Sequence, residues 1–210
     1  MSRAPTPSAP DAAEVDPRIA VVIEEGRDIA DRFRAERGRD DWHPFIPANY
    51  DRVLTTLRAL FEPGTRFLEW GSGNGVITIV ADLLGYDACG IELDADLVDI
   101  ARDLAGRYHS DARFAAGSFL PQGYHWRAQD GDNRMGTIGE GESGYLLLGR
   151  PLDDFDLVFG YPWPGEEPVM RDVMRRYAGE DARLLLCGGM AELTLYRRPF
   201  TAPLRSSDSR

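Results

Sequence analysis

The sequence predicts an α/β fold: a three-layer sandwich around a mostly parallel sheet, with a final antiparallel strand and an N-terminal helical extension. From Gly64 onward, short apolar runs alternate with segments of helical periodicity, which is typical of strands joined by crossover helices. A glycine-rich turn, residues 71–75, follows the first of these runs. The chain has 210 residues, 43% of them hydrophobic, which is enough for one well-buried domain but short for two.

Two helices are predicted before the sheet. Asp16 and Pro17 form an N-cap and first-turn pair, and apolar residues then recur at helical spacing until Gly38. A second helix follows the segment HPFIPANY and carries apolar residues between Val53 and Phe61. The first helix is amphipathic, so we expect it to pack against the rest of the domain.

The remaining chain divides into a core, an insertion and two tails. One domain is expected over 16–200, made of the helices of 16–62 and a core of 63–200 with an insertion at 121–150. The segments 1–15 and 201–210 are predicted to be disordered, because they contain few large apolar side chains to offset their ordering entropy. The insertion is too long for a structureless loop, which favours a substrate lid or a small hairpin with GYLLLG as one arm.

Within the core, nine elements are predicted in order. Strands are expected at 66–70, 87–92, 112–116, 155–160, 183–187 and 192–198, and helices at 74–84, 95–106 and 166–178. In such a sheet the ligand lies outside the carboxyl ends of the strands, where the strand order reverses. The glycine turn lies at such an end.

Composition narrows the range of partners. The chain carries 24 Lys and Arg against 35 Asp and Glu, and this net charge of −11 repels phosphate backbones and anionic lipid surfaces. Nucleic acid and membrane are therefore disfavoured, and a monomer or homodimer with a neutral or cationic substrate is expected. Cys89 and Cys187 lie in apolar runs and are predicted to be buried thiols of a cytoplasmic protein. The three histidines are far apart, so no metal site is indicated.

The segment FLEWGSGNGV, residues 67–76, has three glycines within five positions. Glycine at 71, 73 and 75 lets the turn adopt backbone angles that are closed to other residues, and it lets a ligand lie close to the main chain. The pattern favours a flat nucleoside as that ligand.

A second strand, DACGIE, ends on Glu92, which stands 21 positions after Gly71. This is close to the interval at which an acid at the second strand end binds a ribose diol, and a carboxylate can accept hydrogen bonds from both hydroxyls. Val76 occupies the place where a dinucleotide fingerprint would have a third glycine, and the chain has no GxxxxGK segment. A nicotinamide site and a P-loop are thus disfavoured.

The stretch FLEWGSGNGVITIVADLLGYDACGIELDADLVDIARDL resembles the Rossmann-like class I methyltransferases that use S-adenosylmethionine. Their acid-x-Gly-x-Gly-x-Gly motif is matched by Glu69 and the glycines that follow it. The resemblance implies that Glu69 helps to hold the methionine ammonium, that Glu92 binds the ribose and that Leu93 lies against the adenine. It implies that the turn lies along the methionine part through Gly71, Ser72, Gly73, Asn74 and Gly75.

The resemblance also assigns a place to the ends of the third and fourth strands. In FAAGSFLP, the segment Gly117, Ser118 and Phe119 stands where the family often has an acid for the adenine amino group, so a hydroxyl or backbone group would replace that carboxylate. Gly160 ends the fourth strand and completes the expected cofactor contacts.

The segment FGYPWP stands where amino-group methyltransferases of this family carry Asn or Asp, then Pro-Pro and an aromatic residue. Here Gly160 and Tyr161 precede Pro162, so the carboxamide or carboxylate is missing and methylation of a nucleobase amine is disfavoured. Tyr161 and Trp163 are predicted to form an electron-rich wall near the transferred methyl group.

A dedicated base is not required, because the leaving group of a sulfonium is already activated. If one is used, Tyr161, Glu166 and His43 are the candidates. Glu166 and Glu167 are better explained as acids favoured at a helix N-terminus than as groups that recognise a cationic substrate. Phe45, Asn49 and Tyr50 are candidate lid residues, although Asn49 also fits a helix cap.

The leading hypothesis is an S-adenosylmethionine-dependent methyltransferase acting on a small-molecule or protein amine or hydroxyl. One alternative is a non-catalytic module that binds the same cofactor, and another is a nicotinamide oxidoreductase. A narrower possibility is a protein lysine methyltransferase, which the chain is similar to in its P..Y segment, its GIEL strand and its end shortly after the fifth strand.

Overall fold

The structure is a computed structural model that describes residues 15–37, 45–126, 137–139, 141–189 and 192–203. Most of both predicted tails, and the candidate base His43, lie outside the described residues. The first three residues of the C-terminal tail are described, and there Pro203 forms a bridge with Tyr196 just beyond the buried side chain of Phe200. The prediction of disorder from residue 201 is therefore wrong for these three residues.

The centre of the fold is a six-stranded sheet in the order β3-β2-β1-β4-β5-β6. All neighbouring strands are parallel except β5 and β6, which confirms the predicted fold class. The strands span Arg66–Trp70 (β1), Asp87–Glu92 (β2), Arg113–Ala116 (β3), Leu157–Gly160 (β4), Arg183–Cys187 (β5) and Leu193–Arg197 (β6).

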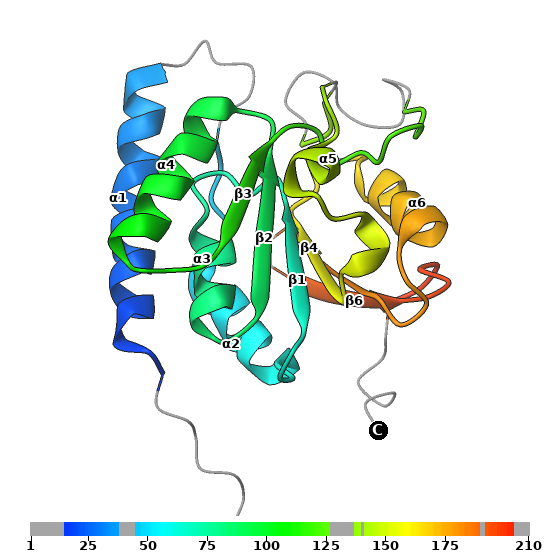
Figure 1. Ribbon diagram of the computed structural model, residues 1–210, viewed down its shortest axis with the longest axis horizontal. Coiled ribbons are helices and arrows are strands. Elements are labelled where there is room, and N and C mark those ends of the chain that lie inside the picture. Colours follow the sequence, from blue (N-terminus) through cyan, green and yellow to red (C-terminus); the bar gives the residue numbers. More distant parts are fainter. Residues whose placement is uncertain (1–14, 38–44, 127–136, 140, 190–191, 204–210) are drawn as a thin grey trace, which may run out of the picture.

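Helices cover both faces of the sheet (Figure 1). They are α1 (Pro17–Arg37), α2 (Tyr50–Leu60), α3 (Val76–Leu83), α4 (Ala95–Arg107), α5 (Gly144–Leu148) and α6 (Glu167–Tyr177). On one face α3 and α4 pack against the strands while α1 and α2 cover α3, and on the other face lie α5 and α6. Within the described ranges no helix is both long enough and apolar enough to cross a membrane.

Alternation along β1 divides the apolar interior into two cores, one on each face of the sheet. Phe67 points into the core beneath α1 to α4, whereas Leu68 and Trp70 point into the core shared with α5 and α6. The ring of Trp70 stacks on Phe119 at 4.7 Å between centroids, and its indole nitrogen donates to the Tyr145 hydroxyl at 2.8 Å. These contacts fix β1, which carries the glycine turn at its carboxyl end.

The segment GYLLLG was predicted to be one arm of a hairpin, and that prediction is wrong. Its residues form the short helix α5, which packs against β2 and β3 and ends at Gly149 in the left-handed conformation, φ 66°. Five residues are too few for apolar periodicity to separate a helix from a strand. A 3-10 turn, Leu152–Asp154, then leads into β4.

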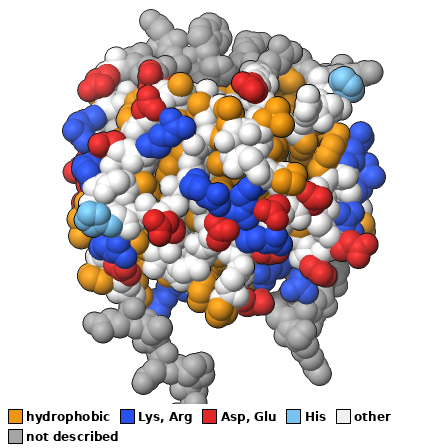
Figure 2. Space-filling view, in the orientation of Figure 1, with side chains coloured by type: hydrophobic (Ala, Val, Ile, Leu, Met, Phe, Trp, Pro, Cys, Tyr) orange, Lys and Arg blue, Asp and Glu red, His pale blue; other side chains and the backbone are white. Residues whose placement is uncertain are grey.

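Ion pairs tie together the amino ends of the strands. The guanidinium of Arg66 pairs with Asp156 at 2.7 Å and with Asp154 at 2.6 Å, and Arg150 joins Asp154 to Asp87. Figure 2 shows that basic and acidic side chains are interspersed over this view of the surface. The network fixes the end of the sheet opposite the glycine turn.

Candidate functional site

The site lies where the strand order reverses, between β1 and β4. Loops that leave the carboxyl ends of adjacent parallel strands diverge there and leave a crevice. A cavity of about 1080 Å³ opens at this place, which is at the upper end of the usual size of a ligand pocket. It is lined by residues 45–48, by the turn after β1, by 92–94 after β2, by 137–139, by 161–165 after β4 and by 188–189 after β5.

The glycine turn has the left-handed backbone that its sequence predicts. Gly71 and Gly73 have φ of 68° and 52°, and the amides of Gly71 and Ser72 both donate to the carbonyl of Ile91 in β2. A Cβ at Gly71 would lie 2.5 Å from the Thr137 methyl group, and one at Gly73 would overlap the ring of Phe45. Glycine is therefore needed at these two positions so that Thr137 and Phe45 can pack against the turn, and it also leaves the backbone accessible to a ligand.

The other residues of the turn have different roles. Asn74 donates to the carbonyl of Gly26 at 2.8 Å and accepts from the Tyr50 hydroxyl at 3.3 Å, so it holds α1 and α2 against the turn. Gly75 packs against Ala101 and does not line the cavity. Ser72 does line it, and its hydroxyl is buried with no partner among the described residues.

Glu69 lies in β1, two residues before the first glycine. Its side chain is buried, and one oxygen accepts from both the amide and the hydroxyl of Thr78, at 2.9 and 2.5 Å. Burial disfavours the ionised form, and the negative charge of Glu92 acts in the same direction, so the pKa of Glu69 is raised to about 8. An uncompensated acid at a cavity wall is suited to a cationic ligand group.

Glu92 ends β2 and lies beside the glycine turn. One carboxylate oxygen accepts from the amide of Gly73 at 2.8 Å, and the other accepts from the amide of Asp94 at 3.0 Å. Burial raises the pKa of Glu92, against the opposing effect of these amides. Each oxygen can accept a further hydrogen bond, so the carboxylate can still bind a diol.

Six of the predicted cofactor contacts lie outside the cavity lining: Gly73 and Gly75 of the turn, and Gly117, Ser118, Phe119 and Gly160. The hydroxyl of Ser118 donates to the carbonyl of Gly139 at 2.8 Å, and Gly117 abuts the segment that leads into α5. Phe119 belongs to the core, where it stacks on Trp70. Gly160, the last residue of β4, packs against Met170 of α6. Leu93 lines the cavity, and Gly139 is its close neighbour.

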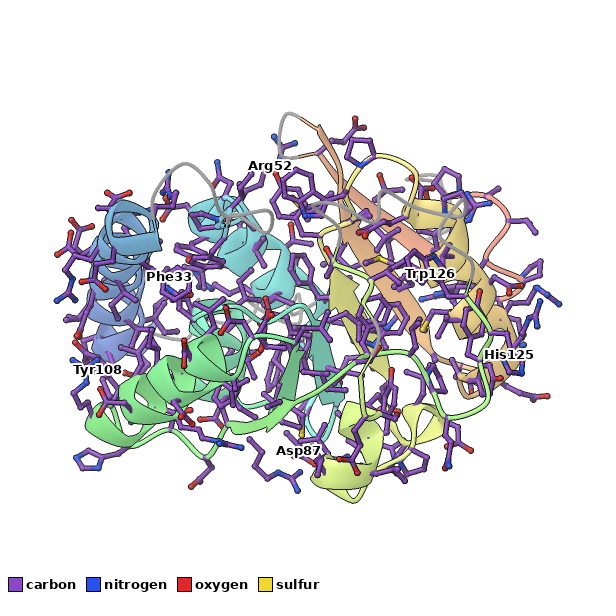
Figure 3. All side chains as sticks on the ribbon, turned by 90° about the horizontal axis from the view of Figure 1, so that it is seen from above. Phe33, Arg52, Asp87, Tyr108, His125 and Trp126 are labelled. Carbon is purple, nitrogen blue, oxygen red and sulfur yellow. The ribbon has the colours of Figure 1, made fainter. Side chains whose placement is uncertain are left out.

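Several lining residues were missed by the sequence analysis. Gly188 and Gly189 follow β5 directly, and a glycine pair at the carboxyl end of a parallel strand is a signal that could have identified them. Thr137, Ile138 and Gly139 carry no comparable signal, because only tertiary contacts bring this part of the insertion to the cavity. Trp126 also lines the cavity, and Figure 3 shows it on the α6 side, opposite Phe33 of α1.

The loop after β4 forms one wall of the cavity. Tyr161 and Trp163 both line the cavity together with the prolines that follow them. The carbonyl of Tyr161 accepts a hydrogen bond from the Thr137 hydroxyl at 3.1 Å, which joins this wall to the insertion. Two prolines restrict the backbone of the loop, so the aromatic side chains are held in place.

Glu166 lies behind this loop and not in the cavity lining. Its side chain has 0% exposure, and its two oxygens accept from the amides of Ile138 at 3.0 Å and Trp163 at 2.9 Å. Burial raises its pKa, while these amides lower it. The neighbouring Glu167 does line the cavity, where it accepts from the hydroxyl of Tyr196 at 2.8 Å.

Of the three candidate lid residues, two line the cavity and one caps a helix. Phe45 lines the cavity and meets the ring of Phe33 edge-on at 6.4 Å between centroids, and Tyr50 also lines the cavity. Asn49 accepts from the amide of Arg52 at 3.1 Å and caps α2, so the helix-cap interpretation applies to this residue.

The described part of the cavity lining is acidic. Its acidic members are Glu69, Glu92, Asp94 and Glu167, and none of the lining residues is Arg, Lys or His. A wall of this charge favours cationic groups over phosphates. Among the described residues there is also no group of three or more His, Cys, Asp or Glu placed to hold a metal ion.

Comparison with curated proteins finds short local similarity. No family model matches the chain. The chain is 39% identical over 62 residues to a ribosomal protein L11 methyltransferase of Ralstonia pickettii, which covers 29% of this chain and 21% of that protein. It is 43% identical over 54 residues to the protein of the same name from Cupriavidus taiwanensis, covering 25% and 18%. The chain thus spans about a fifth of the length of these relatives.

Solved structures give a weaker likeness over more of the chain. An RNA methyltransferase from Salinibacter ruber in complex with S-adenosyl-L-homocysteine has a TM-score of 0.46 at 19% identity, over 69% of this chain and 80% of that one. The YcgJ protein from Bacillus subtilis has a TM-score of 0.45 at 17% identity, over 65% and 50%. Similarity at this level does not indicate a substrate for this chain.

Proposed function

Since the chain has the Rossmann-like fold of class I methyltransferases, we propose that it is an enzyme that binds S-adenosylmethionine and transfers its methyl group. The acceptor in this proposal is an amine or hydroxyl of a small molecule or a protein. The observation that carries the proposal is one arrangement: a glycine turn between Glu69 and Glu92, at the carboxyl ends of adjacent strands, on a cavity of about 1080 Å³. This volume has room for a nucleoside cofactor and part of an acceptor.

The residues fit each part of the cofactor. Glu92 retains lone pairs for the two ribose hydroxyls, and Leu93 offers an apolar face for the adenine. Glu69 is a buried acid that ionises when the ammonium group lies beside it, because the cation offsets the cost of burying the carboxylate charge. When bound, S-adenosylmethionine supplies an electrophilic methyl group on a sulfonium.

The protein's contribution to transfer is alignment and the exclusion of water. Tyr161 and Trp163 form an electron-rich wall that attracts a cationic or polarised group and shields it from solvent. Their loop is held by prolines and by the buried Glu166, so its position is set before ligands bind.

We propose a cationic amine as the acceptor group. The four acidic side chains of the described lining, without a basic side chain among them, favour an amine over a phosphate-bearing acceptor. The curated relatives are named for a ribosomal protein, which supports a protein side chain as one source of the amine. A lysine methyltransferase is the narrower form of this proposal, and RNA is the competing acceptor.

The buried free thiols Cys89 and Cys187 fit a reducing compartment, so we propose the cytoplasm as the location.

Transfer of a labelled methyl group from S-adenosylmethionine into a cell lysate tests the proposal. The lysate is divided by treatment with ribonuclease, with protease or by filtration, so that labelled RNA, protein and small molecules are separated. The chain contains no lysine, so labelled lysine in a hydrolysate cannot come from the enzyme itself. Label that depends on the wild-type protein and is lost with Glu92→Ala supports transfer. Cofactor binding without any label would instead support the non-catalytic module.

A further inference from the structure

Thr137–Gly139, here termed the strap, is a cavity wall that touches both halves of the site. At its start the Thr137 methyl group lies against Gly71, and its hydroxyl donates to the carbonyl of Tyr161 at 3.1 Å. At its end the carbonyl of Gly139 accepts from the Ser118 hydroxyl at 2.8 Å. The strap therefore contacts the glycine turn on the cofactor side and the aromatic loop on the acceptor side.

The carboxylate of Glu166 joins the strap to the loop that follows β4. One oxygen accepts from the amide of Ile138 at 3.0 Å and the other from the amide of Trp163 at 2.9 Å. The side chain is fully buried, and a buried amide without an acceptor is costly, so both walls depend on this one group. A single side chain thus bridges two segments that are more than twenty residues apart in the sequence.

We propose that Glu166 is a positioning residue: its carboxylate holds the strap and the loop of Tyr161 and Trp163 at a fixed separation, and so sets the width of the acceptor half of the cavity. The consequence for catalysis rests on the proposed function. The positioning itself is a property of the protein alone and can be measured without methyl transfer.

A direct role of Glu166 in proton transfer is disfavoured by its surroundings. Both oxygens are engaged by backbone amides, and the side chain has no exposed surface toward the cavity. Glu167, the next residue, is the acid that lines the cavity. Glu166 therefore acts through Trp163 and Ile138.

Fluorine NMR of protein labelled with 5-fluorotryptophan tests the positioning. The chain has four tryptophans, and replacement of each by Phe assigns its resonance. Glu166→Gln retains the shape of the side chain but has only one oxygen to accept from two amides, so the Trp163 resonance is expected to shift while that of the buried Trp70 stays in place. The matched control is Glu180→Gln, an exposed acid outside the site, which is expected to leave both resonances unchanged.

Amide exchange supplies a second reading on the same samples. At least one of the amides of Ile138 and Trp163 is expected to exchange at least about tenfold faster in Glu166→Gln than in the wild type, because the single oxygen of Gln can replace only one of the two acceptors. If Glu166→Gln does not fold, Thr137→Val serves instead, since it removes a hydroxyl that contacts the carbonyl of Tyr161 and also acts on the Glu166 carboxylate. The same Trp163 shift, reduced in size, is then expected.

Measuring the binding of S-adenosylhomocysteine distinguishes the role of the Ser118 end of the strap from that of the Glu166 end. Ser118→Ala frees Gly139 beside Leu93 and is expected to weaken this binding about tenfold, whereas Glu166→Gln is expected to change it less than threefold. Unchanged exchange at Ile138 and Trp163, with an unmoved Trp163 resonance, would overturn the proposal. So would unaltered NMR readings in a Glu166→Gln protein that has lost all methyl transfer, since Glu166 would then act in the chemistry. Failure of the wild type to transfer methyl groups refutes the proposed function and leaves these NMR readings intact.

Discussion

The carboxylate of Glu92 accepts a hydrogen bond from the amide of Gly73 at 2.8 Å, so the end of β2 is tied to the glycine turn that leaves β1. The acid that is proposed to bind the ribose is thereby fixed beside the backbone that is proposed to hold the methionine. Because β1 and β2 are paired in register up to Trp70 and Ile91, this relationship follows from the sheet itself.

Replacement of Glu92 tests its role in binding. Glu92→Ala removes the acceptor for the ribose, and loss of a charged hydrogen bond corresponds to an increase of about 10- to 100-fold in the Kd for S-adenosylhomocysteine. Isothermal titration calorimetry measures this change. Asp99→Asn, on the exposed side of α4, is the control and should leave the Kd unaltered. Equal affinity of Glu92→Ala and the wild type would show that the ribose is not bound there.

The raised pKa of Glu69 predicts a dependence of stability on pH. Between its ordinary value of 4.5 and about 8, the folded state retains a proton that the unfolded state has lost. The free energy of unfolding therefore falls as pH rises through this window, by about 1.4 kcal/mol per pH unit from this group. Glu69→Gln removes the effect, so urea denaturation at pH 5 and pH 8 should show the variant gaining stability relative to the wild type. Parallel changes in the two proteins would contradict the assignment.

The same group predicts a release of protons on cofactor binding. A cation beside Glu69 favours its ionised form and lowers its pKa, so at pH 7 the binding of S-adenosylmethionine should release a proton. Calorimetry in phosphate and in Tris reveals this release, because the observed enthalpy then depends on the ionisation enthalpy of the buffer. In Glu69→Gln the dependence should disappear, and its persistence would assign the proton to another group.

The aromatic wall is predicted to act in transfer more than in cofactor binding. Trp163→Ala opens the acceptor side of the cavity to water and should reduce the rate of methyl transfer about 10- to 100-fold. The Kd for S-adenosylhomocysteine should change less than about threefold, since Glu69 and Glu92 are untouched. A large loss of cofactor affinity with an unchanged rate would place Trp163 on the cofactor instead.

The ion pairs at the other end of the sheet predict a loss of stability in acid. The hydrogen bonds from Arg66 hold the pKa of Asp156 below its ordinary value of 3.8. Such a group stabilises the fold above that value, and the contribution is lost as pH falls through the folded pKa. Asp156→Asn should remove about 1 kcal/mol at pH 7, a modest figure because both partners are partly exposed, and should flatten the acid denaturation that sets in below the ordinary pKa of 3.8. Acid transitions of equal slope would refute the assignment.

The local sequence was sufficient to predict the strands and to place the two acids Glu69 and Glu92 beside the glycine turn. Runs such as RFLEW and RLLLC are short, apolar and bounded by polar residues, so their bounds agree with β1 and β5. Glu69 and Glu92 were found because both lie at fixed offsets from the glycines, and such offsets are preserved when a strand, a turn and a helix fold as one unit.

The features that the sequence did not predict depend on contacts between residues that are far apart in the chain. The strap reaches the cavity because Glu166 accepts from Ile138, and nothing near residue 138 indicates this. Ser118 was assigned to the cofactor from its place after β3, yet its hydroxyl is engaged by the carbonyl of Gly139. In both cases a residue of the insertion forms a hydrogen bond with a side chain that the sequence pattern had assigned to the functional site.

A crystal structure of the complex with S-adenosylhomocysteine tests the central claim most directly. The account predicts the nucleoside in the cavity beside the turn 71–75, with its ribose hydroxyls on the Glu92 carboxylate and its adenine against Leu93. A nucleoside bound elsewhere, or Gly71 and Gly73 still covered by Thr137 and Phe45 at saturating ligand, would contradict it.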